Sequence, residues 1–304
     1  MTHLHIKGMH GLGDNLHQRG IIRQLMQRHT VWLETPWPCV YHDLVREGLL
    51  LVATESQLRT QSKNAERERA MFHADRAPAT AEQLRIFYTP QEVRAQGSVL
   101  GAMASHCGVS VDAADFRLPI PQAWHDQAAP WLARWNPSRP IAIYRPLNER
   151  TEWGGCAARN PDHGAYAQLI QSVRHDYFIV SVADFVRGEE WMVGHDIKAD
   201  TECHAGELPF ETLAALASNA LFVFTSPGFA AILAQAVGTP LVCVFGGYES
   251  SRSFSAGAKY ADYLGIDTIS PCECFEHKHA CEKHIDLDAV IPRLRNFLHE
   301  AAHR

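Results

Sequence analysis

One stretch in the second half constrains the fold of this chain most: an apolar run, a tight turn, an Ala- and Leu-rich segment and a second apolar run. Residues 221–224 predict a buried strand, residues 231–237 a helix, and residues 241–245 a second buried strand. A helix that connects two successive strands is typical of a parallel βαβ unit. We therefore expect an α/β fold with parallel sheets.

The turn of this unit is Ser226-Pro227-Gly228. At the N-terminus of a helix, backbone N–H groups and the helix dipole favour an anion, and a glycine allows a ligand close to the backbone. The turn therefore suggests a phosphate or diphosphate site. In the alternative interpretation Ser226 only caps the helix and Gly228 only shapes the turn.

Length and charge narrow the class of protein. The 304 residues suffice for two domains, and the proline-rich stretch 119–140 suggests a boundary that gives domains 1–137 and 138–304. The formal net charge of -6 provides no overall positive field for nucleic acid. No apolar run is long enough for a membrane span, and the N-terminus lacks a signal-peptide core. We therefore expect a cytoplasmic protein with reduced thiols.

A glycine-rich loop follows the first predicted strand, residues 4–7, and precedes a predicted helix over residues 20–26. The loop contains Gly11, Gly13 and Asp14, but its spacing is not the dinucleotide fingerprint G-x-G-x-x-G. Three interpretations of Asp14 remain open: a helix N-cap, a ligand for a hydroxyl group, or a general base.

Other polar or aromatic residues follow predicted strands, at the sheet edge where open α/β folds bind ligands. Trp37 is a candidate for stacking on a sugar or for packing, and Arg145 and Arg150 are candidates for a phosphate clamp or for solvated arginines. Glu189 is a candidate acceptor for ribose hydroxyls or an exposed acidic turn residue. The loop after the last of these strands contributes Gly246, Gly247 and Tyr248.

A segment near the C-terminus contains Cys272, Cys274, His277, Cys281 and further histidines. The spacing C-x-C-x6-C differs from the C-x2-C pairs of structural zinc sites. We therefore favour a disulfide or plain thiols, with a zinc cluster of Cys272, Cys274, His277 and Cys281 as the alternative.

The N-terminal Gly-Leu-Gly-Asp loop and the later motif Ser-Pro-Gly-x9-Ala-Val-Gly-Thr-Pro-Leu-Val-Cys-Val-Phe-Gly resemble those of the heptosyltransferase-like enzymes of glycosyltransferase family nine. The resemblance implies a GT-B fold: two Rossmann-like domains with parallel sheets that face a cleft, with the acceptor on the first and the nucleotide sugar on the second. It also implies a metal-independent, inverting transfer to a hydroxyl of a surface glycan or lipopolysaccharide-like acceptor, without a cofactor.

The resemblance assigns the role of base to Asp14. Because it places the acceptor on the first domain, Trp37 is the candidate acceptor contact there. The expected donor and phosphate residues are Gly13, Arg145, Arg150, Glu189, Ser226, Pro227, Gly228, Gly246, Gly247 and Tyr248. The chain departs from the family at Ser226, where the family has an acid, and at Ala231, where it has a histidine. These departures point away from ADP-heptose specifically, while a sugar nucleotide remains the expected donor.

Two alternative functions remain. One is transfer to a hydroxymethylated DNA base, for which residues 63–76 supply local Lys and Arg, although the acidic net charge disfavours nucleic acid. The other is a nucleotide-sugar-binding protein that no longer catalyses transfer.

Overall fold

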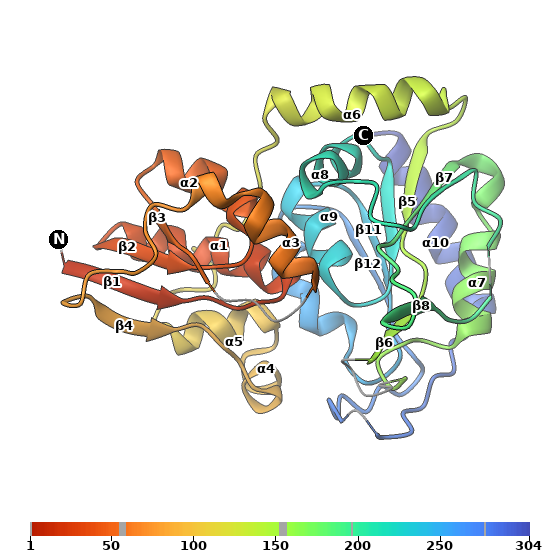
Figure 1. Cartoon of the computed structure of the whole chain (residues 1–304). Coiled ribbons are helices and arrows are strands. Elements are labelled where there is room, and N and C mark those ends of the chain that lie inside the picture. The colour runs from red at the N-terminus through yellow and green to blue at the C-terminus, as the bar shows by residue number, and fades with distance from the viewer. Residues whose placement is uncertain (1, 55–58, 152–156, 196, 277) are drawn as a thin grey trace. The chain divides into compact units, whose positions relative to one another are not determined.

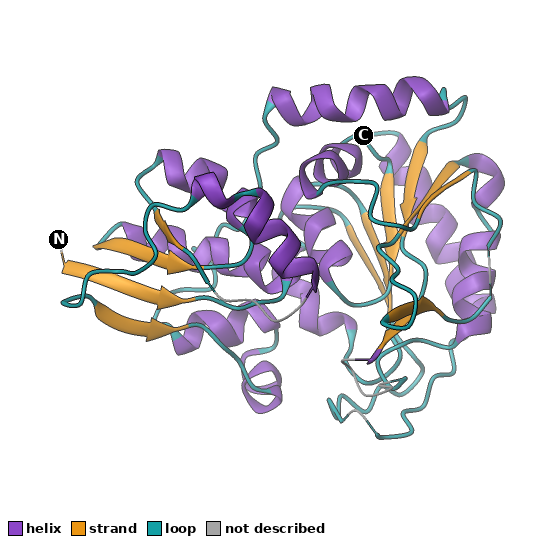
Figure 2. Cartoon of the chain, viewed as in Figure 1, coloured by secondary structure: helices purple, strands orange, loops and turns teal. Residues whose placement is uncertain are grey.

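The computed structural model describes residues 2–54, 59–151, 157–195, 197–276 and 278–304 (Figure 1). Contacts between Cα atoms divide the chain into two compact units, Met1–Pro119 (unit 1) and Ile120–Arg304 (unit 2). Each unit contains a parallel sheet with helices packed against it (Figure 2). The two Rossmann-like sheets that the sequence predicted are therefore present.

Unit 1 contains a four-stranded sheet in the order β3-β2-β1-β4. All its strand pairs are parallel, so the carboxyl ends of the strands share one edge. The chain order reverses between β1 and β4, and such a switch point is where open α/β sheets bind ligands. The strands are β1 (Thr2–Lys7), β2 (His29–Glu34), β3 (Leu50–Val52) and β4 (Glu82–Arg85).

The helices of unit 1 follow local sequence signals. Thr89 and Glu92 form a capping box, in which the Thr89 hydroxyl accepts from the Glu92 amide at 3.2 Å. This helix ends at Gly97, and Ser98 caps the helix that follows. The helices are α1 (Leu12–Met26), α2 (His42–Arg46), α3 (Arg59–Arg67), α4 (Pro90–Gln96) and α5 (Val99–His106), with 3-10 turns at Pro38–Tyr41 and Arg69–Met71.

A buried arginine joins distant segments of unit 1. Arg19 of α1 is 1% exposed, and its guanidinium forms a two-point ion pair with Asp43, at 2.9 and 2.7 Å. It also donates to the backbone oxygens of Val40 and Arg117, the latter at 2.9 Å. A buried charge requires such partners, because desolvation without them is costly.

Unit 2 contains a six-stranded parallel sheet in the order β12-β11-β10-β5-β7-β9. Counted along unit 2 this is the 3-2-1-4-5-6 order of a doubly wound sheet, with its switch point between β5 and β10. The strands are β5 (Ile141–Tyr144), β7 (Phe178–Val182), β9 (Thr201–Cys203), β10 (Phe222–Thr225), β11 (Leu241–Val244) and β12 (Tyr263–Ile266); a small antiparallel pair joins β6 (Asn148–Arg150) to β8 (Glu190–Met192).

Helices cover both faces of the unit 2 sheet, with α8 and α9 on one face and α7 and α10 on the other (Figure 1). The aromatic rings of Tyr144, Tyr166 and Phe224 pack together in the core at centroid distances of 5.0–6.1 Å. The helices are α6 (Gln122–Trp135), α7 (His163–Gln171), α8 (Phe210–Ser218), α9 (Phe229–Val237) and α10 (Leu287–Ala302), with 3-10 turns at Arg174–Asp176 and Ser251–Gly257.

The contact-based division falls at Pro119, before the boundary expected from the prolines near residue 137. Helix α6 belongs to unit 2 because it packs on α8, where the rings of Trp124 and Phe210 meet edge to face at 6.0 Å. Among the described helices, none has the length and apolar character needed to cross a bilayer.

Candidate functional site

The first group of candidate residues lies at the switch point of unit 1. Asp14 occupies the first turn of α1, directly after the loop that leaves β1, and is half-buried. The Tyr88 hydroxyl, which follows β4, donates to Asp14 Oδ1 at 3.3 Å. A Cβ atom placed on Gly11 would lie 2.5 Å from Asp14 Oδ2, so a side chain there would displace the carboxylate. Gly11 is thus required for this carboxylate position.

Asn15, which sequence reasoning missed, holds the glycine-rich loop. Its side-chain amide donates to the backbone oxygens of Met9 and Gly11 at 2.7 and 2.8 Å. Its Oδ1 accepts from the hydroxyls of Thr35 and Tyr41 at 2.7 and 2.9 Å. Because Asn15 is fully buried, these bonds fix the loop that positions its neighbour Asp14.

Trp37 and Gly13, two predicted site residues of unit 1, are buried. Trp37 is 4% exposed, and its indole N–H donates to the His10 backbone oxygen at 2.7 Å. The ring therefore supports the glycine-rich loop and offers little surface for stacking. Gly13 is buried in the first turn of α1 beside Asp14, whereas the other predicted donor residues belong to unit 2.

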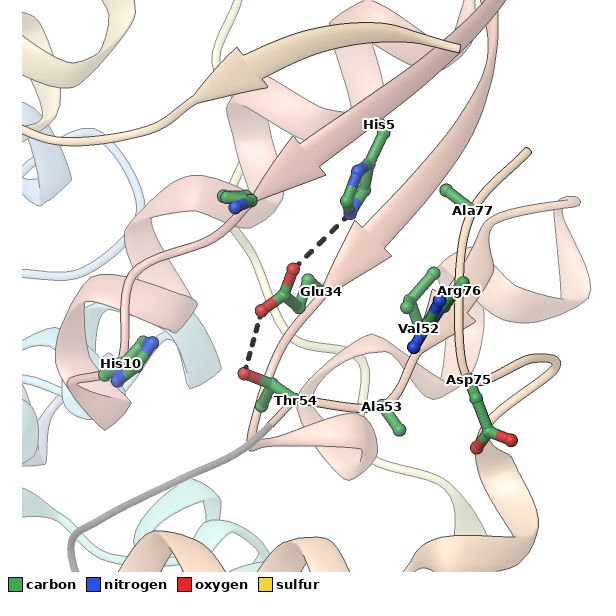
Figure 3. Close-up of a pocket in the computed structure, with 10 residues that line it drawn as sticks. His5, His10, Glu34, Val52, Ala53, Thr54, Asp75, Arg76 and Ala77 are labelled. Atoms are coloured by element: carbon green, nitrogen blue, oxygen red, sulfur yellow. Dashed lines mark hydrogen bonds and ion pairs between the residues drawn. The ribbon is translucent and has the colours of Figure 1, made fainter. Parts of the chain in front are cut away.

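A pocket of about 430 Å³ opens at the carboxyl edge of the unit 1 sheet (Figure 3). Glu34 lies within it and contacts the His5 imidazole at 3.5 Å and the Thr54 hydroxyl at 3.1 Å. Its volume is in the range of small-molecule sites. The lining residues carry groups of both charges: His5, Lys7, His10, Glu34, Val52, Ala53, Thr54, Asp75, Arg76 and Ala77.

The second group of candidate residues lies at the switch point of unit 2. Ser226, Pro227 and Gly228 form the turn from β10 into α9, as the sequence predicted, and Gly228 is the N-cap. Gly228 has φ 153°, and a Cβ atom placed on it would meet no atom within 4 Å. The start of α9 therefore combines amide donors with open space, the two requirements of an anion site.

Arg145 lies beside this turn and shares a carboxylate with Arg150. Arg145, which follows β5, has its guanidinium carbon 5.7 Å from the centre of the Phe229 ring, at the first residue of α9. Glu190 contacts Arg145 at 3.2 Å and Arg150 at 3.0 Å, and also accepts from the Asn148 amide. Burial lowers the pKa of Arg145 and Glu190 opposes this effect, but arginine remains charged at neutral pH. Arg145, Arg150 and Glu190 together carry one net positive charge, and the Asp184 carboxylate also acts on Arg145.

Glu189, the carboxylate predicted from the sequence, is the chain neighbour of Glu190, which forms the ion pairs with Arg145 and Arg150. Glu189 is exposed, and its backbone oxygen accepts from the Thr151 amide at 2.9 Å. Glu190 is buried, whereas its two chain neighbours, Glu189 and Trp191, are exposed. Glu190 is thus a site residue that the sequence analysis did not select.

The predicted loop after β11 is closely packed. A Cβ atom on Gly246 would lie 2.3 Å from the Asn160 backbone oxygen, and one on Gly247 would lie 2.6 Å from that of Glu282. Tyr248 is half-buried, and its ring meets that of Phe275 edge to face at 5.4 Å. Both glycines therefore allow close approach of protein backbone, and Tyr248 is the residue here with an accessible side chain.

The cysteine segment brings together Cys272, Cys274 and Cys281, three of the four residues predicted as the alternative zinc cluster. His277 lies outside the described residues, and the histidine that joins the three thiols is His279. All three cysteines are free, so of the two favoured interpretations, a disulfide or plain thiols, no disulfide is formed.

No family model matches the sequence, and no curated protein matches it. Similar solved structures include a glycosyl transferase family 9 protein of Veillonella parvula, 13% identical, with TM-score 0.59 over 98% of this chain and 97% of that one. ADP-heptose lps heptosyltransferase II of E. coli is 14% identical, with TM-score 0.56 over 99% of both chains. The iron-containing dodecameric glycosyltransferase TibC of enterotoxigenic E. coli is 14% identical, with TM-score 0.61 over 99% of this chain and 76% of that one. The chain therefore has the GT-B fold that the sequence resemblance predicted.

Proposed function

We propose that this chain is a glycosyltransferase that moves a sugar from a nucleoside diphosphate to an acceptor hydroxyl, with inversion at the anomeric carbon. The observation that carries the proposal is that Asp14 lies at the switch point of unit 1, while the open N-terminus of α9 lies beside Arg145 at the switch point of unit 2. The likeness to solved glycosyltransferases over nearly the full chain supports it.

Unit 2 supplies the groups for the donor. The first amides of α9 and the net positive charge of the Arg145–Glu190–Arg150 group suit the diphosphate, whose negative charge increases as the sugar leaves. These groups stabilise the leaving nucleotide with protein donors, so the transfer step itself needs no metal. Ser226 adds a neutral hydroxyl at the same turn, which takes a diphosphate without the repulsion of an acid.

Unit 1 supplies the base. Asp14 accepts the proton of the acceptor hydroxyl while that oxygen forms a bond with the anomeric carbon. The bond between the anomeric carbon and the phosphate oxygen breaks, and its electron pair leaves with the nucleoside diphosphate. Attack from the side opposite the leaving group inverts the anomeric centre. The Tyr88 hydroxyl donates to Asp14 Oδ1 at 3.3 Å and so helps to orient the carboxylate.

We propose that the acceptor is a charged glycan. The unit 1 pocket carries Lys7 and Arg76 beside Glu34 and Asp75, so it suits a sugar with both hydroxyl and acidic groups better than a neutral aliphatic alcohol. The solved structures of this fold that resemble the chain include an lps heptosyltransferase, which supports a lipopolysaccharide-like acceptor.

Isothermal titration with ADP, UDP, GDP, CDP and dTDP, followed by transfer assays with the sugar series of the nucleotide that binds, tests the proposal. We expect one nucleotide series to bind, and Gly228→Ala to weaken it about tenfold because the methyl group and the changed φ alter the turn. Gly48→Ala is the matched control, since Gly48 also has a positive φ, 107°, and open surroundings but lies in unit 1.

The assay separates three outcomes. Transfer with inversion supports the proposal in full. Nucleotide binding without transfer to any glycan or to hydroxymethylated DNA would leave a binding protein. No binding of any nucleotide would refute the donor site and with it the proposed function.

A further inference from the structure

Four metal-binding side chains converge near the C-terminus of unit 2. Cys281 Sγ lies 3.4 Å from Cys272 Sγ and 3.6 Å from Cys274 Sγ. The Nδ1 atom of His279 lies 3.7, 3.5 and 3.5 Å from the sulfurs of Cys272, Cys274 and Cys281. All four ligand atoms lie within 4.8 Å of one another.

These separations match the edges of a tetrahedron around one ion. With metal–sulfur bonds of about 2.3 Å and a metal–nitrogen bond of about 2.0 Å, tetrahedral geometry places sulfurs about 3.8 Å apart and nitrogen about 3.6 Å from each sulfur. A disulfide would require two sulfurs at about 2.05 Å, which no measured pair approaches. A disulfide would also leave the third cysteine and His279 without a role.

We propose that Cys272, Cys274, His279 and Cys281 bind one thiophilic metal ion, zinc or iron, through three thiolates and the histidine Nδ1 atom. Binding of the ion releases the thiol protons, and the metal–sulfur bonds replace the sulfur–hydrogen bonds. The backbone between the ligands fits this role. Glu273 and Phe275 have φ values of 49° and 56°, and the Glu276 amide points at Cys274 Sγ from 3.4 Å.

The same segment holds the loop that follows β11. The amides of Glu273 and Phe275 donate to the backbone oxygens of Gly247 and Tyr248 at 3.0 and 3.1 Å. Cys272 Sγ also lies 3.2 Å from the Gly247 oxygen. Because Glu273 and Phe275 alternate with ligands Cys272 and Cys274, a bound ion fixes the two amides that hold this loop. The ion thus has a structural role in the loop after β11. Metal binding is inferred independently of the proposed function, whereas any effect of the ion on binding of the nucleotide-sugar donor rests on that function.

Metal content of the full chain tests the site. The protein is produced in medium supplemented with zinc or with iron and is analysed by plasma mass spectrometry, with the visible spectrum distinguishing coloured iron thiolate from colourless zinc. We expect about one ion per chain in the wild type and in Cys107→Ser, a free cysteine in unit 1 that serves as the control. His279→Ala and Cys274→Ser are expected to lose most of the ion. His279 is exposed, so its substitution leaves the core intact.

Wild-type protein with little metal from either medium, or variants that retain the ion, would overturn the site. Hydrogen exchange tests the structural role: removal of the ion with a chelator is expected to speed exchange at least tenfold at the amides of Glu273 and Phe275, but not in β1. Unchanged exchange there would refute the link to the β11 loop. Metal binding in a chain that binds no nucleotide would support this inference while refuting the proposed function.

Discussion

The Tyr88 hydroxyl donates to Asp14 Oδ1 at 3.3 Å, a contact that joins the residues after β4 to the first turn of α1. The two strands that precede these residues, β1 and β4, are neighbours in the sheet although 74 residues separate Tyr88 from Asp14. Parallel pairing places both at the carboxyl edge, at the switch point of unit 1. The carboxylate that we propose as the base is therefore oriented by the sheet topology and not by its own loop alone.

Substitution Asp14→Asn should remove the base but keep the shape of the side chain. We expect kcat to fall by about 10² to 10⁴, the usual contribution of a general base, with the Kd for nucleotide unchanged. Asp112→Asn, at an exposed position of unit 1, is the control. Steady-state kinetics and titration measure the two quantities, and a variant with more than about a tenth of the wild-type kcat would rule out Asp14 as the base.

Gly11→Ala should displace the same carboxylate without altering its chemistry. The added Cβ would lie 2.5 Å from Asp14 Oδ2, so we expect kcat to fall by about 10² because a small misplacement of a catalytic group has a large cost. Gly164→Ala is the control, since its nearest atom would be 3.3 Å away. Circular dichroism should show both variants folded, and wild-type kinetics in Gly11→Ala would contradict the role of the carboxylate position.

Arg145→Gln should weaken both the fold and the donor site. Glu190 keeps Arg150 but loses one buried partner, which we expect to lower the free energy of unfolding by about 2 kcal/mol. The Kd for nucleotide should rise about tenfold with the loss of a charged contact. Arg293→Gln, exposed on α10, is the control in urea denaturation and titration. An unchanged Kd for nucleotide would show that the Arg145–Glu190–Arg150 group is not part of the donor site.

His17→Leu should make unit 1 less sensitive to acid. Burial lowers the pKa of His17 from 6.5 to about 3, so below pH 6.5 the unfolded chain binds a proton that the folded chain does not. The contribution of neutral His17 to the free energy of unfolding is fully present above pH 6.5. It is lost as the pH falls from 6.5 toward 3, by roughly 1.4 kcal/mol per pH unit. Urea denaturation at pH 7.5 and 5.5 should show a smaller loss for His17→Leu than for wild type. The exposed His106→Gln should retain the wild-type difference, and an equal loss in all three proteins would contradict this origin.

From the sequence we could predict which loops lie at the carboxyl edges of the sheets, but not which side chains contact one another at those edges. Apolar runs and the turn signals at Ser226-Pro227-Gly228 and Gly11 to Asp14 correctly placed two strand-to-helix loops, because both signals are local in the sequence. Which carboxylate contacts Arg145 depends on the pairing of β8 with β6, and this long-range pairing places Glu190 opposite Arg150. The pattern of apolar and polar residues along the sequence does not determine the register in which β6 and β8 pair.

The cysteine cluster shows the same limit. Residue types indicated a metal site, but the spacing argued against one because it assumed the C-x2-C turn. The left-handed backbone at Glu273 and Phe275 brings Cys272 and Cys274 together with one residue between them. Such a conformation is uncommon for residues other than glycine, so the sequence offered no sign of it.

The Arg19–Arg117 bond has a consequence for the order of folding during synthesis. It spans 98 residues, and Arg117 lies just before the end of unit 1. Until the ribosome has released residue 117, the buried Arg19 guanidinium lacks one of its hydrogen-bond acceptors, so α1 cannot complete its packing. We therefore expect unit 1 to reach its native state late, near the start of unit 2 synthesis, and to be most open to chaperones before then.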